Sequence, residues 1–425
     1  MSVDVIIGLQ RGDEGKGRFV DLAASDYDVV ARGNGGANAG HTIVPDGMKP
    51  IALHQIPSGI AYKRRLNIVG NGVYLDPRKF RAELMQLQNL GIKISHDNLL
   101  VSSSAHLVMP HHIVLDELRE GGSSAQGSTK AGIAYVASDK YLREGIRVET
   151  VFDAKELYKK AYDGLVHVNR QRKTSLTEIA AEARDWVAAV ELLKPYVADT
   201  VEVINSRIKA GNKVLVEGAQ AYGLDIDHGM YPYVTSSSTT VSGLLNGLGI
   251  APKHVNKVIG VAKAVKSHVG GGPLVTEIND AALAANVRGP EGAVDSEFGA
   301  TTKRPRRIGY LDIVELRNAI TVNGVDELVL SKLDHVPRFG STVMVATQYR
   351  FKGKLINAAP SSAGSLAQCE PVYVTLDTWP DISAVRSYAK LPSAAIKFIE
   401  LIETELATAV TKIGVGPKRH QVIIR

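Results

Sequence analysis

The chain is poor in the features that mark secreted, zinc-clustered and membrane proteins. Its 425 residues include one cysteine, Cys369, so an internal disulfide and a paired-cysteine zinc site are both excluded. No stretch approaches the roughly 18 consecutive apolar residues of a membrane span. The N-terminus lacks a basic segment followed by an apolar run of signal-peptide length. These absences predict a protein of the reducing cytoplasm with no membrane partner.

Aromatic residues and clustered charge are also scarce. Phe, Trp and Tyr make up 6% of the residues, and the formal net charge of +6 is spread along the chain rather than gathered in a basic run. Nucleic-acid surfaces usually show basic runs interleaved with aromatics, so we expect no nucleic-acid partner. The basic excess instead suits a field that attracts small anions such as nucleotides.

What the sequence does contain is an alternation of short apolar runs with longer helical patterns. The runs are rich in β-branched residues and include 5–7, 29–30, 214–216, 258–259 and 328–330. Because they are apolar at consecutive positions, they suit strands that are covered on both faces. The sequence therefore predicts an α/β fold in which a large, mainly parallel central sheet is flanked by helices. We expect one elaborated domain over residues 1–425, since no linker interrupts the patterns.

Two amphipathic helices are predicted with particular clarity. One begins at Ser175, which has capping-box spacing to Glu178. The other spans 394–402 and precedes a C-terminal strand at 422–424. The Gly/Ser-rich stretch 121–132 predicts a mobile loop rather than a domain boundary, because regular patterns resume directly after it.

A glycine-rich segment follows the first predicted strand. It reads Gln10-Arg11-Gly12-Asp13-Glu14-Gly15-Lys16-Gly17, and a helix can begin at Arg18. Backbone N–H groups, a helix N-terminus and a lysine together suit a phosphate. The loop is P-loop-like, but Gln10 stands for the first Walker glycine and Gly17 for the Ser/Thr that holds Mg2+. Asp13 is therefore the predicted hard ligand for Mg2+, or a base toward a bound substrate.

A second glycine loop, residues 33–42, follows the predicted strand 28–32 and contains His41 near its end. We expect this histidine to be exposed. A single histidine is more often structural, but one at the end of a glycine loop can also reach a reacting phosphate as an acid or hydrogen-bond donor. The presence of two glycine loops favours the second interpretation.

These segments resemble the adenylosuccinate synthetase family. The resemblance begins with 12–17 and 38–42 and continues over nearly the whole chain, at 56–60, 70–73, 217–220, 224–229, 231–237, 297–302, 332–334 and 416–417. Enzymes of this family use GTP, Mg2+ and aspartate to convert IMP to adenylosuccinate. The purine 6-oxygen is phosphorylated and then displaced by the aspartate amine. The resemblance therefore implies a C–N bond-forming ligase of purine biosynthesis that also releases GDP and phosphate.

The resemblance also implies roles for the matching residues. Asp13 would remove the N1 proton and bind Mg2+, and His41 would stabilise the transferring phosphoryl group. Lys16 and Gln220 would neutralise charge at the 6-oxygen, and the Gly40 carbonyl would be the second ligand of one Mg2+ per subunit. Contacts to GTP would come from Gly12, Glu14, Gly15, Lys16, Gly17, Gly40, Thr42, Lys332, Asp334, Gly414, Gly416 and Pro417. Contacts to IMP would come from Asp13, Asn38, Thr129, Arg143, Gln220 and Thr235, and contacts to aspartate from Thr301, Thr302, Arg304 and Arg306.

The chemistry of two of these segments fits the implied ligands. Lys332 and Asp334 follow the predicted strand 327–330. A carboxylate there can accept both the N1–H and the amine of guanine while the lysine stem covers the base, which favours GTP over ATP. The segment 301–307 combines hydroxyls with closely spaced guanidiniums, which suit the two carboxylates of aspartate.

Several residues depart from the family pattern. The usual arginine of the segment after residue 127 is Ala131, with Lys130 beside it. In the aspartate segment, Lys303 and Pro305 stand where Gly and Arg are common, so we expect an altered amino-acid affinity. Arg11 stands for Trp in the first glycine loop. These differences suggest a divergent branch of the family.

A partner and two alternatives follow from the same comparison. Arg143 stays in register with the family, which implies that it reaches the IMP phosphate in the partner subunit of a homodimer. One alternative is the same chemistry on GMP or dGMP, giving a 2-amino product, although the retained Asp13 favours IMP. The other is a non-catalytic GTP-binding homologue, which is disfavoured because Asp13, Lys16, His41 and Gln220 occur together.

Overall fold

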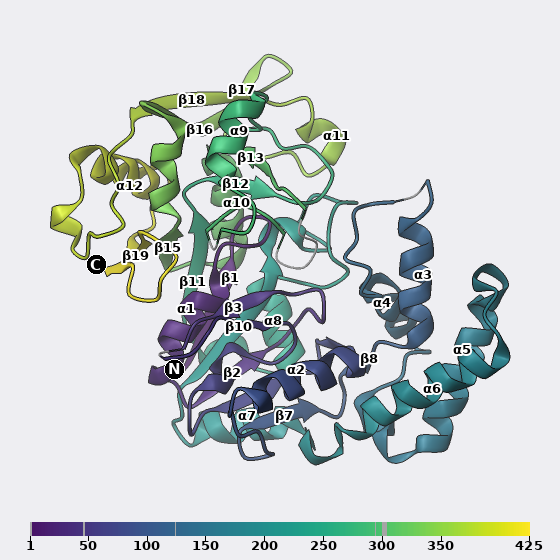
Figure 1. Ribbon diagram of the computed structural model, residues 1–425. Coiled ribbons are helices and arrows are strands. Elements are labelled where there is room, and N and C mark those ends of the chain that lie inside the picture. Colours follow the sequence, from purple (N-terminus) through teal and green to yellow (C-terminus); the bar gives the residue numbers. More distant parts are fainter. Residues whose placement is uncertain (1, 46, 124, 294, 300–303) are drawn as a thin grey trace. The chain divides into compact units, whose positions relative to one another are not determined.

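The computed structural model describes residues 2–45, 47–123, 125–293, 295–299 and 304–425 (Figure 1). The chain forms two compact units, each assembled from separate segments. The first unit comprises Met1–Asp4, Phe19–Ala219 and Thr235–Asn256, and the second comprises Val5–Arg18, Gln220–Val234 and Lys257–Arg425. The expectation of one elaborated domain stays a prediction.

The predicted large, mainly parallel sheet is confirmed. Its ten strands are, in order, β20 (Val422–Ile424), β19 (Val410–Gly414), β15 (Glu327–Ser331), β11 (Val255–Lys263), β1 (Val3–Gly8), β10 (Val214–Ala221), β2 (Val29–Arg32), β5 (Leu66–Val69), β7 (Leu99–Ser102) and β9 (Val197–Ala198). In the first unit, β10, β2, β5, β7 and β9 are parallel neighbours. In the second, β11, β15 and β19 are parallel, and the edge strand β20 runs antiparallel to β19.

Burial explains why these runs form central strands. All four residues of β2 and of β5 are buried, as are residues 328–331 of β15. A strand that is apolar on both faces loses contact with water only when both faces are covered, which is the arrangement of parallel sheets. The consecutive apolar positions therefore predicted the sheet type correctly.

The helices have the following bounds. Those of the first unit are α2 (Pro77–Asn89), α3 (Pro110–Glu120), α4 (Ile133–Leu142), α5 (Ala154–Arg172), α6 (Leu176–Glu191), α7 (Thr200–Lys209) and α8 (Val241–Leu248). The first glycine loop leads into α1 (Lys16–Ala23), two residues earlier than predicted. The second unit also contains α9 (Ala281–Arg288), α10 (Ile313–Asn323), α11 (Ala363–Leu366) and α12 (Ser393–Leu406).

Both helices that were predicted from periodicity are present as α6 and α12. Ser175 is the N-cap of α6: its hydroxyl accepts the Glu178 N–H at 3.3 Å, and the Glu178 carboxylate accepts the Ser175 N–H at 3.0 Å. Trp186 on the buried face of α6 is fully buried and donates its indole N–H to the Val108 carbonyl at 2.9 Å. The apolar stripe of α6 is therefore core, and α6 packs beside α5 (Figure 1).

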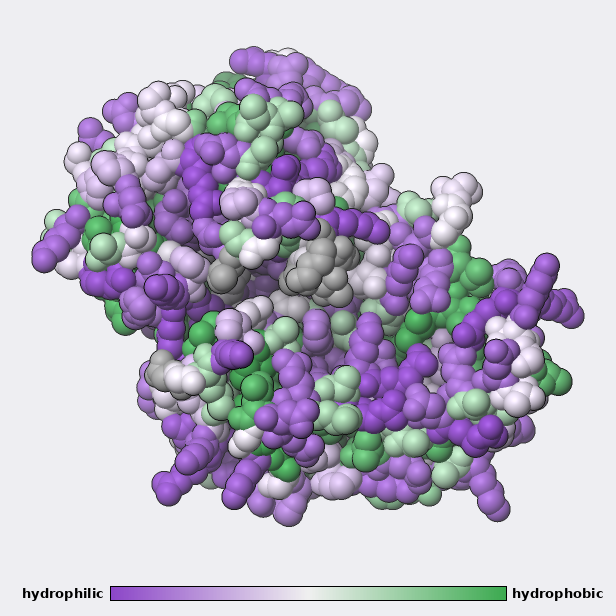
Figure 2. All heavy atoms as spheres, in the orientation of Figure 1, coloured by the Kyte–Doolittle hydropathy of each residue, from purple (hydrophilic) through white to green (hydrophobic). Residues whose placement is uncertain are grey.

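The second unit carries a smaller sheet built from β14 (Leu311–Asp312), β16 (Thr342–Phe351), β17 (Lys354–Ile356) and β18 (Glu370–Asp377). The stretch 121–132 joins α3 to α4, in agreement with the predicted loop. The face shown in Figure 2 is mainly hydrophilic, with hydrophobic residues in small groups. In the part of the chain that the structure describes, every helix is too short or too polar to span a bilayer.

Candidate active site

The first glycine loop is a tight turn with unusual backbone angles. Gly12, Asp13 and Gly15 have φ values of 96°, 58° and 87°, a left-handed region that suits glycine and that aspartate tolerates better than most residues. A Cβ on Gly8, the last residue of β1, would lie 2.5 Å from a Glu14 carboxylate oxygen. The glycines are thus required by the close folding of the loop onto the strand end.

Glu14 holds the interior of this loop together. Its fully buried carboxylate accepts the Gly12 N–H at 2.8 Å and the Lys16 ammonium at 2.6 Å. Burial by itself would raise the pKa of Glu14, but the neighbouring Lys16 and Lys263 cations outweigh burial and lower that pKa. Lys16, the residue predicted to contact phosphate, is therefore anchored at the loop by an ionised carboxylate.

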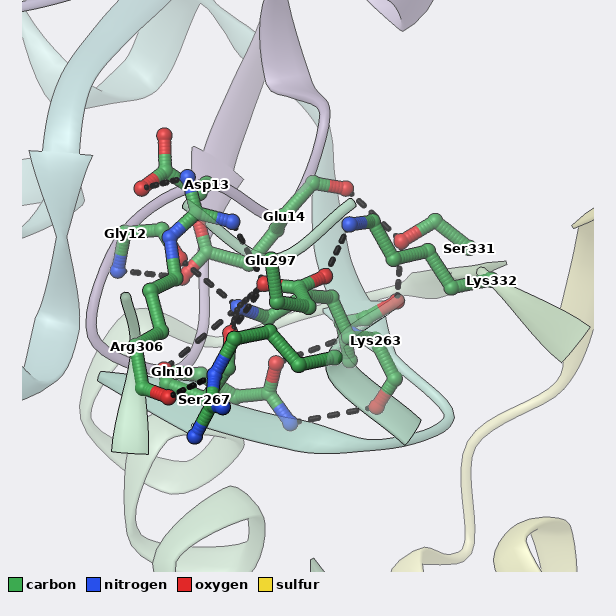
Figure 3. A network of polar contacts seen from close by, with 12 residues as sticks. Gln10, Gly12, Asp13, Glu14, Lys263, Ser267, Glu297, Arg306, Ser331 and Lys332 are labelled. Carbon is green, nitrogen blue, oxygen red and sulfur yellow. Dashed lines mark hydrogen bonds and ion pairs between the residues drawn. The ribbon is translucent and has the colours of Figure 1, made fainter. Parts of the chain in front are cut away.

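Asp13 and Arg306 form an ion pair in the second unit (Figure 3). The Arg306 Nη2 lies 2.6 Å from the Asp13 Oδ2, and the Asp13 side chain is 32% exposed. The predicted base of the first loop thus contacts a predicted aspartate-binding guanidinium from a segment almost three hundred residues later. Arg304 is exposed, whereas Thr301 and Thr302, with Lys303, lie outside the described residues.

The predicted base-recognition residues lie at the ends of two parallel strands. Lys332 follows β15 with a φ of 58°, and Asp334 lies in the short 3-10 helix Leu333–Phe339. Burial raises the pKa of Asp334. Gly414 ends β19, and Gly416 and Pro417 follow it. Ligands of open parallel sheets usually bind at such carboxyl ends.

Arg18 connects this C-terminal segment to helix α1. Its guanidinium donates to the carbonyls of Gly416 at 2.7 Å and Gln421 at 3.1 Å, and also to that of Lys418. Our reading of the sequence missed this role. A signal was available, because a cation in the first turn of a helix is opposed by the helix dipole and needs a specific partner.

In the first unit, His41 is buried rather than exposed, so the sequence-based expectation was wrong. Its side chain is 6% exposed, and its Nδ1 contacts the Oε1 of Glu217. Glu217 on β10 is fully buried and also accepts from Arg32 Nη2 at 2.8 Å and from the N–H and hydroxyl of Ser58, each at 2.7 Å. The imidazole of His41 is buried because its partner, the Glu217 carboxylate, lies in the interior.

The contacts of Nδ1 orient the ring of His41. Arg32 Nη2 lies 2.7 Å from the same Nδ1, but a guanidinium only donates, and both groups share the Glu217 oxygen. When Nδ1 carries a proton, the imidazole and the Arg32 guanidinium both donate to the same Glu217 oxygen. Burial raises the pKa of Glu217, but Arg32 and His41 more than offset it and hold that pKa well below its usual range. Glu217 therefore stays ionised and orients the ring.

Two predicted IMP contacts are brought together in the first unit. The Asn38 amide donates to the Thr235 hydroxyl at 3.2 Å. Thr129 and Arg143 are exposed, and Arg143 ends helix α4 with a φ of 66°. Gln220 has a φ of 57°. A left-handed residue is ordinary at a helix C-cap such as Arg143, whereas Gln220 lies within β10, where a non-glycine residue with this angle is uncommon.

The metal and GTP predictions rest on further backbone positions. Gly40 is half-buried at the end of the second glycine loop, and Thr42, one residue after His41, is exposed on β3 (His41–Ile43). Gly17 lies in the first turn of α1. Glycine and hydroxyl residues at a loop end leave backbone groups accessible to a phosphate.

Comparison with known proteins decides the family. A family model described as adenylosuccinate synthetase matches residues 5–423. The chain belongs to the adenylosuccinate synthetase family. Relatives of that name from Caldicellulosiruptor bescii and Brevibacillus brevis are 43% identical over 434 residues and 40% identical over 431 residues, covering 100% of this chain and 99% of each relative.

Solved structures agree with the assignment. The structure titled fully ligated adenylosuccinate synthetase from Plasmodium falciparum has a TM-score of 0.89 and 35% identity and covers 100% of both chains. Cyanophage S-2L succinoaminodeoxyadenylate synthetase, bound to dGMP and dATP, has a TM-score of 0.62 and 20% identity over 100% of this chain and 95% of that chain. The second similarity shows a shared fold alone.

The structure explains three departures from the adenylosuccinate synthetase pattern. Ala131 is buried in a small apolar cluster, so it cannot replace the usual arginine as a contact, while Lys130 is exposed. Pro305 forms an isolated bridge with Phe298. Arg11 is buried, donates to the Pro273 carbonyl at 2.8 Å and pairs with Glu315.

Proposed function

We propose that this member of the adenylosuccinate synthetase family joins L-aspartate to IMP at the expense of GTP, giving adenylosuccinate, GDP and phosphate. The observation that supports the proposal most directly is the ion pair between Asp13 and Arg306. It joins a carboxylate of the phosphate loop to a guanidinium of the amino-acid segment. The reaction needs both, because a base must act on the purine and a cation must receive aspartate. A loop that only binds nucleotide requires neither.

In the first step, Asp13 takes the N1 proton of IMP, so that the 6-oxygen can attack the γ-phosphoryl group of GTP. Lys16 and Gln220 offset the charge that develops around this oxygen. In this step His41 acts as the doubly protonated imidazolium: Glu217 holds its Nδ1–H, and its Nε2–H donates a hydrogen bond to the transferring phosphoryl group. Positioning and charge compensation are the main requirements of phosphoryl transfer.

The donor atoms of the proposed metal site fit Mg2+. Asp13 offers a partly exposed carboxylate and Gly40 a backbone carbonyl, and hard oxygen ligands with room for water are what Mg2+ prefers. When bound, the ion would offset phosphate charge. We assign one Mg2+ per subunit to these two ligands.

The proposed GTP site uses the ends of β15 and β19. Asp334 accepts the N1–H and 2-amino group of guanine, and the stem of Lys332 covers the base. Gly416 and Pro417 enclose the base from the segment that Arg18 holds. The remaining contacts to GTP are assigned to Gly12, Glu14, Gly15, Lys16, Gly17, Gly40, Thr42 and Gly414.

The other two substrates are assigned to distinct residues. Contacts to IMP come from Asp13, Asn38, Thr129, Gln220 and Thr235, and contacts to aspartate come from Thr301, Thr302, Arg304 and Arg306. Arg143 is assigned to the IMP phosphate of a partner subunit in a homodimer. Its exposure at the end of α4, beside the exposed Tyr141 and Leu142, supports this assignment. A cytoplasmic location stays part of the proposal.

A substrate panel tests the proposal. Purified protein is incubated with Mg2+, aspartate and each of IMP, GMP and dGMP, with GTP or ATP as phosphoryl donor, and products are identified by mass spectrometry. We expect adenylosuccinate from IMP with GTP. Turnover with dGMP alone would assign the enzyme to 2-aminopurine chemistry. Hydrolysis or retention of GTP without consumption of aspartate would show a binding protein instead.

A further inference from the structure

Glu297 is a buried carboxylate with no role in the reaction as described above. It lies between α9 and β13 (Arg307–Gly309), and its side chain is fully buried in the second unit. Burying an ionised carboxylate is costly unless it is paired and hydrogen-bonded. The identity of its partners therefore indicates what the charge is for.

The two oxygens of Glu297 face different parts of the site (Figure 3). Oε1 accepts from the Lys332 ammonium, which belongs to the proposed guanine site. Oε2 accepts from Arg306 Nη1 and from the Ser267 hydroxyl. One carboxylate thus bridges the lysine of the nucleotide site and the arginine of the amino-acid site.

Arg306 is held by Glu297 along one edge only. Its Nη1 bonds to Glu297, while its Nη2 lies 2.6 Å from Asp13. A guanidinium presents its donors in a rigid fork, so fixing one edge also fixes the direction of the other. Glu297 therefore aims the Nη2 edge toward the Asp13 carboxylate or toward a substrate carboxylate that takes its place.

The backbone strengthens this link. The Arg306 N–H donates to the Glu297 carbonyl at 3.0 Å, and the Gly299 N–H donates to the Arg304 carbonyl at 2.9 Å. Phe298 and Pro305 form the bridge between them. Glu297 and Arg306 thus face each other at the base of the segment that carries the aspartate residues.

The positive charges around Glu297 need its carboxylate as their counterion. The Lys263 ammonium lies 3.9 Å from Oε2, so three cations surround one carboxylate. Burial raises the pKa of Glu297, but these cations outweigh it and hold that pKa well below its usual range. Burial lowers the pKa of Lys263 to about 8. Without the carboxylate, the three cations would face one another inside the protein.

We propose that Glu297 is a positioning residue that couples the guanine site to the aspartate site, because it holds Lys332 and Arg306 at the same time. The inference rests on the proposed function for the roles of these two residues. Loss of Glu297 loosens both groups, and disturbance of one group reaches the other through the shared carboxylate.

The first measurement uses nucleotide binding alone. GDP is titrated calorimetrically into the wild type, Glu297→Gln, Glu297→Asp and the control Glu327→Gln. Glu327 starts β15, the strand that ends before Lys332, and its carboxylate is paired with Lys257. We expect Kd for GDP to rise about tenfold in Glu297→Gln, to recover to within about threefold of the wild type in Glu297→Asp, and to stay unchanged in the control.

The second measurement tests coupling by a double-mutant cycle. At saturating GTP, Lys332→Ala should raise KM for aspartate when it is made in the wild type. The same substitution should cause no further rise when it is made in Glu297→Gln. We expect kcat to change less than KM in each variant. The coupling would be overturned if the two substitutions raised KM for aspartate independently, so that the rise in the double variant equalled the product of the two single rises. A Kd for GDP that Glu297→Gln leaves within about twofold of the wild type would also overturn it.

A third arm decides the inference even if the protein does not use aspartate. Arg306→Ala is expected to raise Kd for GDP about threefold when it is made in the wild type, and to leave Kd unchanged when it is made in Glu297→Gln. An inactive wild type would refute the proposed function, whereas unchanged GDP binding in Arg306→Ala would refute the coupling. If Glu297→Gln does not fold, as judged by circular dichroism, the cycle between Arg306→Ala and Lys332→Ala decides. Effects on Kd for GDP that are not additive in free energy would support the coupling, and additive effects would overturn it.

Discussion

At the scale of single residues, Asp13 carries the heaviest chemical demand, since it is assigned both proton abstraction and Mg2+ binding. Asp13→Asn keeps the size of the side chain but neither takes a proton nor supplies an anionic ligand. We expect kcat for adenylosuccinate formation to fall by about 10³-fold or more. The control is Asp4→Asn, which removes a carboxylate paired with Tyr27 and Asn256. It should keep near-wild-type kcat, and equal losses in both variants would contradict the assignment.

Glu217 is the residue that gives His41 a fixed orientation. Glu217→Gln preserves the shape of the buried side chain but weakens its hold on the Nδ1–H of His41. We expect kcat to fall by about 10- to 100-fold, with smaller changes in the three KM values. Steady-state kinetics with each substrate varied in turn provides the measurement. Ser58→Ala removes one of several donors to Glu217 and should have a smaller effect; unchanged kcat in Glu217→Gln would refute the orienting role.

At the scale of elements, helix α2 is joined to the segment before the short 3-10 helix Ser58–Ala61 by one carboxylate. Glu83 on α2 accepts the backbone N–H groups of His54, Gln55 and Ile56 at 3.0, 3.0 and 3.1 Å. Burial raises the pKa of Glu83 to about 7, from an ordinary value of 4.5. Between these values the folded protein keeps a proton that the unfolded chain has lost.

The sign of the effect on stability follows directly. The contribution of Glu83 is fully present below pH 4.5 and is lost as pH rises through 7. We expect the free energy of unfolding in urea to lose up to about 3 kcal/mol from this group between pH 5 and pH 8. Glu83→Gln should flatten that part of the profile. A variant profile that parallels the wild type would show that Glu83 does not titrate in this range.

Helix α6 offers a separate test of a local signal. Ser175→Ala removes the hydroxyl that accepts the Glu178 N–H, and it should lower the free energy of unfolding by about 1 kcal/mol. Ser175→Asp keeps a cap acceptor and serves as the control. Equal stability of the wild type and Ser175→Ala in urea titrations would indicate that the cap contributes nothing measurable.

At the scale of the whole molecule, the proposed homodimer places Arg143 of one subunit at the site of the other. Asp13→Asn and Arg143→Ala proteins should each be nearly inactive. When they are mixed in equal amounts and allowed to exchange subunits, half of the dimers are mixed, and each mixed dimer has one intact site. We expect recovery of roughly one quarter of wild-type activity. No recovery, despite exchange confirmed by mass spectrometry, would exclude a shared site.

Local signals account for what could be predicted correctly. Ser175 and Glu178 are three residues apart, and their capping box forms within one helical turn. The run 328–330 is apolar at every position, and it became a buried strand of a parallel sheet. The prediction for His41 was wrong because its burial depends on Glu217, which is 176 residues away in the chain. A sequence pattern in the neighbourhood of His41 cannot indicate a contact with a residue so far along the chain.

The sequence by itself determined the α/β class, the order of the glycine loops and the family, because these depend on periodicity and on motifs that are contiguous in the chain. The tertiary structure decided which charges meet. Glu217 with His41, Arg18 with the Gly416 segment and Glu297 with Lys332 all join residues brought close by strand order and register. The first glycine loop supplies Asp13 as a base, but its pairing with Arg306 arises only when the chain is folded.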